Sequence, residues 1–236
     1  IGYLSQLVDI THVENDEAIK ADAEAKLALL TPIAKAFLTE IGLECTSHGI
    51  QILGGHGFIK EWGMEQLMRD TKISCIYEGT TGIQALDLLA RKILGSQGEI
   101  LKPFAGEVAT FCQNNMANEA MAEFITPIMT FAGQWQKMTQ SIGAKAMKNP
   151  DEIGAASVDY LMYSGYVTLA YFWAKMAKVA QDKLAAGDDD KDFYQAKIKT
   201  ARFYFQRILP RAHGHVSCLE NGADSMMDLD AEHFIF

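Results

Sequence analysis

The sequence is poor in cysteine, and the cysteines that it has form no recognisable motif. Only four occur in 236 residues, and no CxxC pair is among them. This scatter is typical of reduced, buried thiols in a cytoplasmic protein rather than of a disulfide framework. The four are Cys45, Cys75, Cys112 and Cys218.

Long apolar runs and clusters of basic residues are also missing. No segment stays apolar over the roughly 20 residues that a membrane-spanning helix needs. No block of Lys and Arg is present, and the formal net charge is −9, so the chain is a poor candidate for binding nucleic acid or an anionic membrane. No signal peptide is visible. Because the chain begins with Ile1 instead of Met, we expect its native N-terminus to be missing.

What remains is the composition of a well-packed globular protein. Hydrophobic residues make up 49% of the sequence and charged residues 22%, a balance that excludes a disordered chain. The length allows one large domain or two small ones. No repeat at a solenoid period occurs.

The first part of the chain has the pattern of a long helix. Apolar residues recur at spacings of three and four between Leu27 and Ile41, after a polar stretch, 11–17, that we expect to be a turn. Pro32 interrupts this pattern. Either a new helix begins there with Thr31 as its cap, or Pro32 kinks a continuous helix. We expect the helix to end at Gly54-Gly55, where glycine supplies a positive φ.

The next segment alternates between helical and irregular patterns. We expect a glycine-rich loop over 54–58 and a short helix over 61–71. The β-branched run 73–77 has the composition of a strand, but we favour a buried extended connector. Thr81 and Gln84 have the spacing of a capping box, and a helix behind them should end at Gly95.

The rest of the chain predicts a second helical domain. Gly95 to Gly98, with the sequence GSQG, is the best linker. Four amphipathic helical patterns follow with short connections, which predicts an antiparallel bundle. The third starts at Asn149-Pro150, and Pro210 either ends or kinks the fourth. We therefore expect an all-α protein with domains at 1–95 and 96–236.

The stretch from Gln51 to Gln84 is the densest in unusual residues. Its glycines allow a ligand to approach the backbone closely, although Gly-Gly-His-Gly alone is more often a helix exit. Glu78 lies between an apolar segment and a helix start. The helix dipole would lower the pKa of its carboxyl, whereas an apolar pocket would raise it, as a general base requires. From spacing alone, Glu78 is more often an electrostatic cap.

Residues of the metal-ligating types near the C-terminus do not predict a metal site. His213 and His215 are two apart and would point away from each other on a helix, so only His215 and Cys218 share a face. We expect no metal.

The stretch from Gln51 to Lys92 resembles the C-terminal signature of the acyl-CoA dehydrogenase family. It contains QILGGHGF, the Arg69-Asp70 pair, IYEGT and the Ile83-Gln84 of the following helix, in that order and at matching spacing. Upstream, LLTPIAKAF is similar to the family's preceding helix. The segment TGIQALDLLARKI, the further helical domain and the tail LPRAHGHVSCLENGADSMMDLD resemble the longer bacterial branch, which includes 3-methylmercaptopropionyl-CoA dehydrogenase-like members.

This resemblance implies roles for individual residues. Glu78 matches the base that removes the α-proton of an acyl-CoA thioester while the β-hydride goes to N5 of FAD. The backbone N–H of that glutamate hydrogen-bonds the thioester carbonyl in the family, and Tyr77 matches a substrate-pocket residue. Thr80 and Gly82 match positions that touch FAD, although many members have Gln where this chain has Gly82. A stretch that contacts the FAD of a neighbouring subunit matches Gln51, Ile52, Leu53, Gly54 and Gly55.

The resemblance also implies a complete reaction. It predicts an FAD-dependent dehydrogenase of fatty acid β-oxidation in the bacterial cytoplasm, a homo-oligomer of at least two subunits with electron-transferring flavoprotein as its acceptor. The family's N-terminal helical domain and middle β domain are not in this sequence, so we expect the chain alone to be inactive and to bind FAD weakly or not at all. Two alternatives stay open: a non-catalytic helical dimerisation or assembly module, and an acyl-CoA oxidase.

Overall fold

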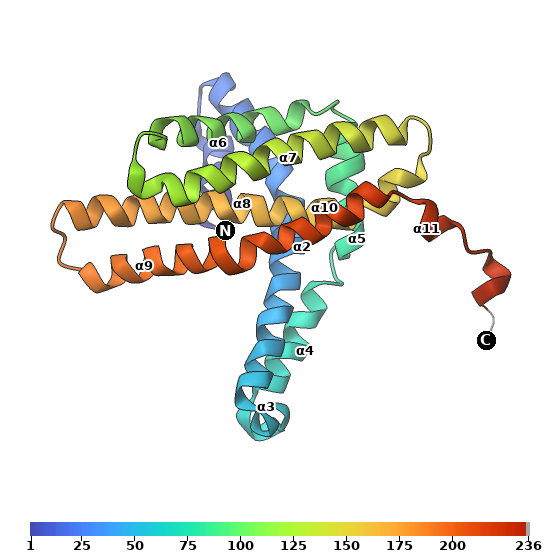
Figure 1. Ribbon diagram of the computed structural model, residues 1–236, viewed down its shortest axis with the longest axis horizontal. Helices are drawn as coiled ribbons and strands as arrows, with labels where there is room; N and C mark the ends of the chain where they lie inside the picture. Colours follow the sequence, from blue (N-terminus) through green and yellow to red (C-terminus); the bar gives the residue numbers. More distant parts are fainter. Residues whose placement is uncertain (235–236) are drawn as a thin grey trace. The chain divides into compact units, whose positions relative to one another are not determined.

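The computed structural model describes residues 1–234 and divides into two compact units, one ending at Ile100 and the other starting at Leu101. Both units consist of helices and their connections, and no strand occurs in the described residues (Figure 1). The prediction of an all-α fold is confirmed.

The first unit is organised around one long helix. Asp16 is the N-terminal cap of this helix, α2, because its carboxylate accepts hydrogen bonds from the N–H groups of Ala18 and Ile19. Helices α1, α4 and α5 pack on α2. The predicted turn is shorter than expected, since α1 continues to Val13. The helices are α1 (Gly2–Val13), α2 (Glu17–Leu53), α3 (Gly55–Phe58), α4 (Met64–Ser74) and α5 (Thr81–Leu86).

Pro32 lies inside α2, so the continuous-helix alternative holds and no new helix begins there. The hydroxyl of Thr31 donates a hydrogen bond to the carbonyl of Leu27 at 2.7 Å. The helix ends at Leu53, and Gly54 follows with φ +59, as the sequence predicts. The predicted glycine loop is wrong in one respect, because Gly55 already begins the short helix α3.

Beyond α5 the chain continues as a π-helical segment, η2 (Asp87–Leu94). The buried side of this segment carries Leu88, Leu89 and Ile93, which are fully excluded from solvent. It packs on α2, as α5 does. The chain then turns through Gln97 and Gly98, both of which have a positive φ.

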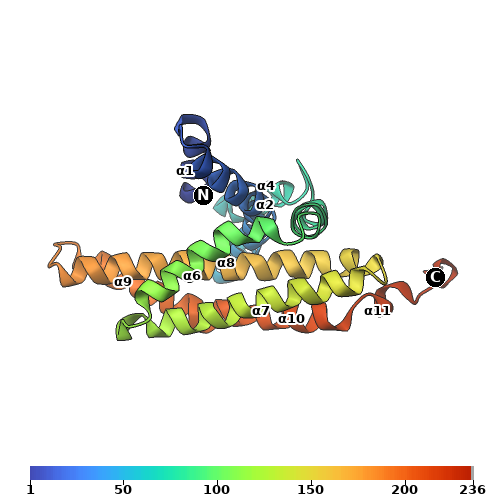
Figure 2. The same ribbon diagram turned by 90° about the horizontal axis from the view of Figure 1, so that it is seen from above.

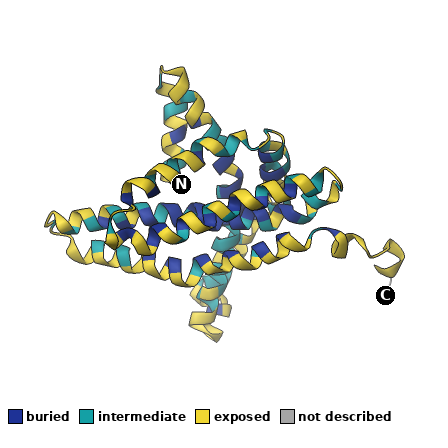
Figure 3. Ribbon diagram, turned by 45° about the horizontal axis from the view of Figure 1, so that its top comes forward, coloured by how far each residue is buried: buried dark blue, intermediate teal, exposed yellow. Residues whose placement is uncertain are grey.

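The second unit is a helical bundle built on α8. Figure 2 shows its long helices side by side, and Figure 3 shows buried residues gathering along α8. The four predicted helical patterns are all present. Pro210 lies in a short 3-10 turn that follows a π-helical turn, and the helix resumes after it. The elements are α6 (Lys102–Asn115), α7 (Ala122–Ala146), α8 (Asp151–Ala185), α9 (Lys191–Phe203), η5 (Tyr204–Ile208), η6 (Leu209–Arg211), α10 (Ala212–Asn221) and α11 (Asp224–Met227).

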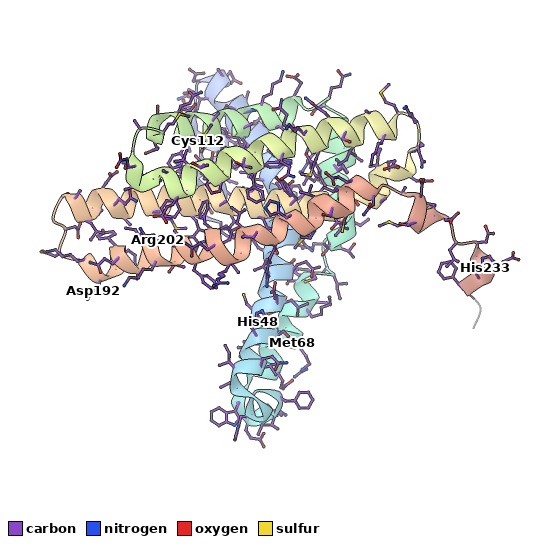
Figure 4. All side chains as sticks on the ribbon, viewed as in Figure 1. His48, Met68, Cys112, Asp192, Arg202 and His233 are labelled. Carbon is purple, nitrogen blue, oxygen red and sulfur yellow. The ribbon has the colours of Figure 1, made fainter. Side chains whose placement is uncertain are left out.

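Buried tyrosines give this bundle polar contacts in an apolar core. The hydroxyl of Tyr163 donates to the carbonyl of Phe131 at 2.7 Å, and that of Tyr204 donates to the carbonyl of Tyr166 at 2.8 Å. Burial raises the pKa of both hydroxyls, and of Tyr160 as well. At the surface, Arg202 of α9, labelled in Figure 4, pairs with Glu123 of α7 at 2.9 Å.

The cysteines follow the prediction only in part. Cys75 and Cys112 are buried, and burial raises the pKa of the Cys112 thiol. Cys45 and Cys218 are exposed, so the expectation that all four are buried is wrong. Among residues 1–234 no helix combines the length and apolar character that crossing a bilayer requires.

Candidate functional site

Glu78 lies in a tight turn between α4 and α5. Helix α4 ends at Ser74, residues 75–78 form the turn, and Gly79 leads towards α5. Glu78 has φ +51 and Gly79 has φ +98. A left-handed conformation costs an L-residue about 1–2 kcal/mol, so the surrounding structure has to hold Glu78 in it. The predicted extended connector over 73–77 is wrong, because contacts with α2 override the strand propensity of these residues.

Neither the carboxylate nor the N–H of Glu78 has a hydrogen-bond partner within residues 1–234, and the residue is exposed. Of the apolar residues before it, only Cys75 is buried, whereas Ile73 is 55% exposed and Tyr77 is 51% exposed. The expectation that these residues surround Glu78 with a dry pocket is therefore wrong for this chain by itself.

Lys35, from the middle of α2, holds both ends of the turn. Its ammonium group donates to the carbonyl of Ser74 at 2.9 Å and to the carbonyl of Gly79 at 2.6 Å. The Ser74 carbonyl is at the C-terminus of α4, where the helix dipole favours a cation. The same ammonium lies 5.7 Å from the centroid of the Tyr77 ring, within the range of a cation–π contact.

The start of α5 is fixed by side chains on either side of the turn. Thr80 is the cap, because its hydroxyl accepts the N–H of Ile83 at 3.4 Å. The amide of Gln84 donates to the carbonyl of Glu78 at 3.3 Å. The predicted capping box of Thr81 and Gln84 is therefore wrong: Thr80 is the cap instead, and the hydroxyl of Thr81 donates to the carboxylate of Glu40 at 2.5 Å.

The five predicted cofactor positions at the end of α2 are exposed. Ile52 is 84% exposed and Leu53 is 38% exposed. No atom lies within 4 Å of the place where a side chain on Gly54 or Gly55 would begin. The backbone there is open to a ligand. Gly57, in contrast, is buried, and a side chain would come within 2.6 Å of the carbonyl of Ile50.

The structure does not bring all the predicted site residues together. Tyr77, Glu78, Thr80 and Gly82 lie within one turn and the start of α5. Lys35 contacts the turn that carries Glu78, and Gln51 lies more than four helical turns further along α2. At the rise per residue of an α-helix, Gln51 and Lys35 are about 24 Å apart along the helix axis. The two sets therefore face separate parts of the first unit, as α3 and α5 do in Figure 1.

The remaining sequence candidates have structural partners. Arg69 donates to Glu65 on the same helix at 2.8 Å, and this hydrogen bond lowers the pKa of the Glu65 carboxyl. His215 lies 2.7 Å from the carboxylate of Asp159 on α8. In residues 1–234 no three potential metal ligands come close enough together to hold an ion.

Sequence reasoning missed Lys35 and Glu40. Their contacts join positions 39 to 44 residues apart, a distance at which local patterns carry no information. One signal was available. Lys35 lies beside Ala36 and Phe37 in the apolar stripe of α2, and a charged residue at the edge of such a stripe is rarely buried without a partner.

Comparison with known families agrees with this architecture. Residues 13–94 match the family described as "Acyl-CoA dehydrogenase, C-terminal domain". Residues 104–230 match the family described as "Acetyl-CoA dehydrogenase C-terminal like". Each match falls within one of the two structural units.

Several characterised relatives are similar over most of the chain. A 3-methylmercaptopropionyl-CoA dehydrogenase of Ruegeria pomeroyi is 35% identical over 89% of the chain and 36% of its own length. The broad-specificity linear acyl-CoA dehydrogenase FadE5 of Mycobacterium tuberculosis is 29% identical over 89% of the chain and 37% of its own length. A butyryl-CoA dehydrogenase of Syntrophomonas wolfei is 29% identical over 96% of the chain and 38% of its own length.

A solved structure shares the fold. The structure of Caenorhabditis elegans ACDH-11 in complex with C11-CoA superimposes with a TM-score of 0.69 at 21% identity, over 86% of this chain and 32% of that one. The chain thus spans little more than a third of the length of these curated relatives. It belongs to the acyl-CoA dehydrogenase family, of which it carries the C-terminal domain and the C-terminal-like extension.

Proposed function

We propose that this chain is the base-carrying C-terminal part of an FAD-dependent acyl-CoA dehydrogenase, which introduces an α,β double bond into an acyl-CoA thioester. The observation that carries the proposal is the turn at Glu78. One residue presents both an exposed carboxylate and an N–H without an acceptor in residues 1–234. The reaction needs both groups, and the family resemblance assigns them to this residue.

The two groups of Glu78 act on neighbouring atoms of the substrate. Its carboxylate accepts the α-proton of the thioester. Its N–H donates a hydrogen bond to the thioester carbonyl, which acidifies the α-carbon by stabilising the negative charge that develops on the oxygen. Tyr77 and the exposed Ile73 and Ile76 contribute apolar surface beside the acyl chain.

The residues of this chain fit FAD at two separate places. Gly54, Gly55 and Gly82 leave the backbone open, with no atom within 4 Å of the position of an added side chain. When bound, FAD supplies the acceptor at N5 for the hydride from the β-carbon. Thr80 and Gly82 would hold it beside Glu78. Gln51 to Gly55 lie about 24 Å away along α2, and the family resemblance implies that they would hold the FAD of a neighbouring subunit.

This arrangement requires a homo-oligomer and other domains. Ile76 is 51% exposed, Ile83 is 57% exposed and Leu86 is 40% exposed around the turn, and a base working on a weak carbon acid needs water to be excluded. We propose that the N-terminal and middle domains of the family cover this surface. The chain alone then neither retains FAD nor turns over, and the intact enzyme passes its electrons to electron-transferring flavoprotein.

The test is anaerobic flavin bleaching in the full-length protein that contains this chain. Addition of a panel of acyl-CoA thioesters should bleach the flavin with one class of chain length and yield the corresponding enoyl-CoA. If no thioester bleaches the flavin while dithionite does, the proposed reaction is wrong. The 236-residue chain purified alone should be colourless, and stoichiometric flavin in it would contradict the proposed role of the other domains.

A further inference from the structure

We propose that Lys35 is a positioning residue for the reaction: it holds the turn of Glu78 in the conformation that aims the carboxylate and the N–H at the substrate. The inference rests on the proposed function, because it assigns a role in the reaction that Glu78 performs. Lys35 itself does not touch the substrate.

The geometry is that of a clamp across the turn. The ammonium of Lys35 donates to the carbonyl of Ser74, the last residue of α4, and to the carbonyl of Gly79, just before the cap of α5. These two carbonyls are the two ends of the segment that carries Glu78. With three donors on one nitrogen, an ammonium can bind both of them at once.

The turn needs these contacts because the backbone conformation of Glu78 is energetically unfavourable. Glu78 has φ +51 and is not a glycine, so without external contacts the turn would relax towards a right-handed conformation. The bond from Gln84 to the Glu78 carbonyl is long, at 3.3 Å. The contacts of Lys35, at 2.9 and 2.6 Å, are shorter and carry a full charge.

Lys35 can keep the turn in place because its own helix, α2, is firmly packed at this position. Ala36, the next residue, is fully buried, and Phe37 is 2% exposed. Glu40, little more than a turn further along α2, receives the hydroxyl of Thr81 at the start of α5. One helix therefore fixes the turn at Lys35 and the following helix at Glu40, and Glu78 lies between the two points.

The experiment compares three variants of the full-length protein in anaerobic flavin reduction by an acyl-CoA that the wild type accepts. Lys35→Met keeps an unbranched side chain as far as the ε carbon and removes the ammonium group with its donors. Lys35→Arg restores donors and charge. Lys20→Met is the matched control, because Lys20 is also on α2 but its ammonium makes no hydrogen bond or ion pair within residues 1–234.

Lys35→Met should lower kcat on the order of 100-fold, as a displaced catalytic group does, with KM within about threefold of wild type. Lys35→Arg should recover most of the loss. Lys20→Met should behave as wild type. Amide hydrogen exchange should be faster over 75–84 in Lys35→Met and unchanged in Lys20→Met. If Lys35→Met loses its FAD or fails to fold, the proposal is tested instead by kcat and by amide hydrogen exchange over 75–84 in Lys35→Arg.

The proposal is overturned if Lys35→Met keeps the wild-type kcat. It is also overturned if kcat falls in Lys35→Met while amide hydrogen exchange over 75–84 stays unchanged. A Lys35→Arg variant that is inactive with wild-type exchange also overturns it. Failure of the proposed function looks different. If Glu78→Gln retains full activity, Glu78 is not the base, whereas faster exchange in Lys35→Met still shows that Lys35 holds the turn.

Discussion

Replacing Gly79 with alanine should disable the Glu78 turn more than the φ angle alone would suggest. Gly79 has φ +98, outside the small left-handed region that other residues tolerate. A Cβ there would lie 2.6 Å from Nε2 of Gln84. The flexible Gln84 side chain would move away, and its hydrogen bond to the Glu78 carbonyl would be lost.

The size of the effect follows from these two contributions. A residue in a sparsely populated φ/ψ region costs on the order of 1–3 kcal/mol, and the lost hydrogen bond about 0.5–1.5 kcal/mol. Gly63→Ala is the control, because Gly63 has φ +69 and no atom within 4 Å of the added Cβ. Gly79→Ala should therefore disfavour the productive turn by about 1.5–4.5 kcal/mol, which corresponds to a population lower by roughly 10- to 2,000-fold, whereas Gly63→Ala should leave that turn unchanged.

The assay is kcat for acyl-CoA-dependent flavin reduction in the full-length protein, with the thermal midpoint measured in parallel. We expect kcat to fall by that factor in Gly79→Ala and to stay near wild type in Gly63→Ala. Equal kcat values in the two variants would refute the reasoning, since the strain and the lost Gln84 contact would then have no bearing on the site.

Three further predictions concern the second unit. Tyr163→Phe should destabilise it by about 1–2 kcal/mol in thermal or urea unfolding, because the buried carbonyl of Phe131 loses its donor; an unchanged midpoint would contradict this. Arg202→Met should cost less than about 1 kcal/mol, because its pair with Glu123 is exposed to solvent, and a loss as large as that of Tyr163→Phe would be unexpected. Burial raises the pKa of Tyr160 and Tyr204 above the model-peptide value of about 10. Above about pH 10 an unfolded chain releases protons that the folded chain keeps, so stability should fall as the pH rises, and less steeply in Tyr204→Phe.

The sequence could predict the features that depend on neighbouring residues. The helical spacing of apolar residues located α2 and the four long helices of the second unit, and Gly54 marked the end of α2 because a positive φ is needed there. These features are local, so the pattern is enough to reveal them. The start of α8 was predicted to within one residue: Pro150 takes the cap position, and the side chain of Asn149 accepts the N–H of Asp151.

The errors of prediction have a common physical origin. The run 73–77 has strand composition, but packing on α2 keeps Ile73 and Ser74 helical and folds the rest into a turn. Thr80 and Thr81 are both capping residues by type, and Glu40, distant in sequence, engages Thr81 and leaves Thr80 as the cap. Lys35 escaped notice for the same reason. Contacts between distant residues decided each of these cases.

The measurement that tests the central claim most directly is the exchange of α-deuterium from a labelled acyl-CoA, together with flavin bleaching, in the wild-type full-length protein and in Glu78→Gln. Glu61→Gln is the control, because Glu61 is an exposed carboxylate in the same unit. Glu78→Gln should bind the thioester but neither exchange the label nor bleach the flavin, while Glu61→Gln matches wild type. If Glu78→Gln exchanges and bleaches as fast as wild type, Glu78 is not the base, and the account of the turn as a catalytic site is wrong.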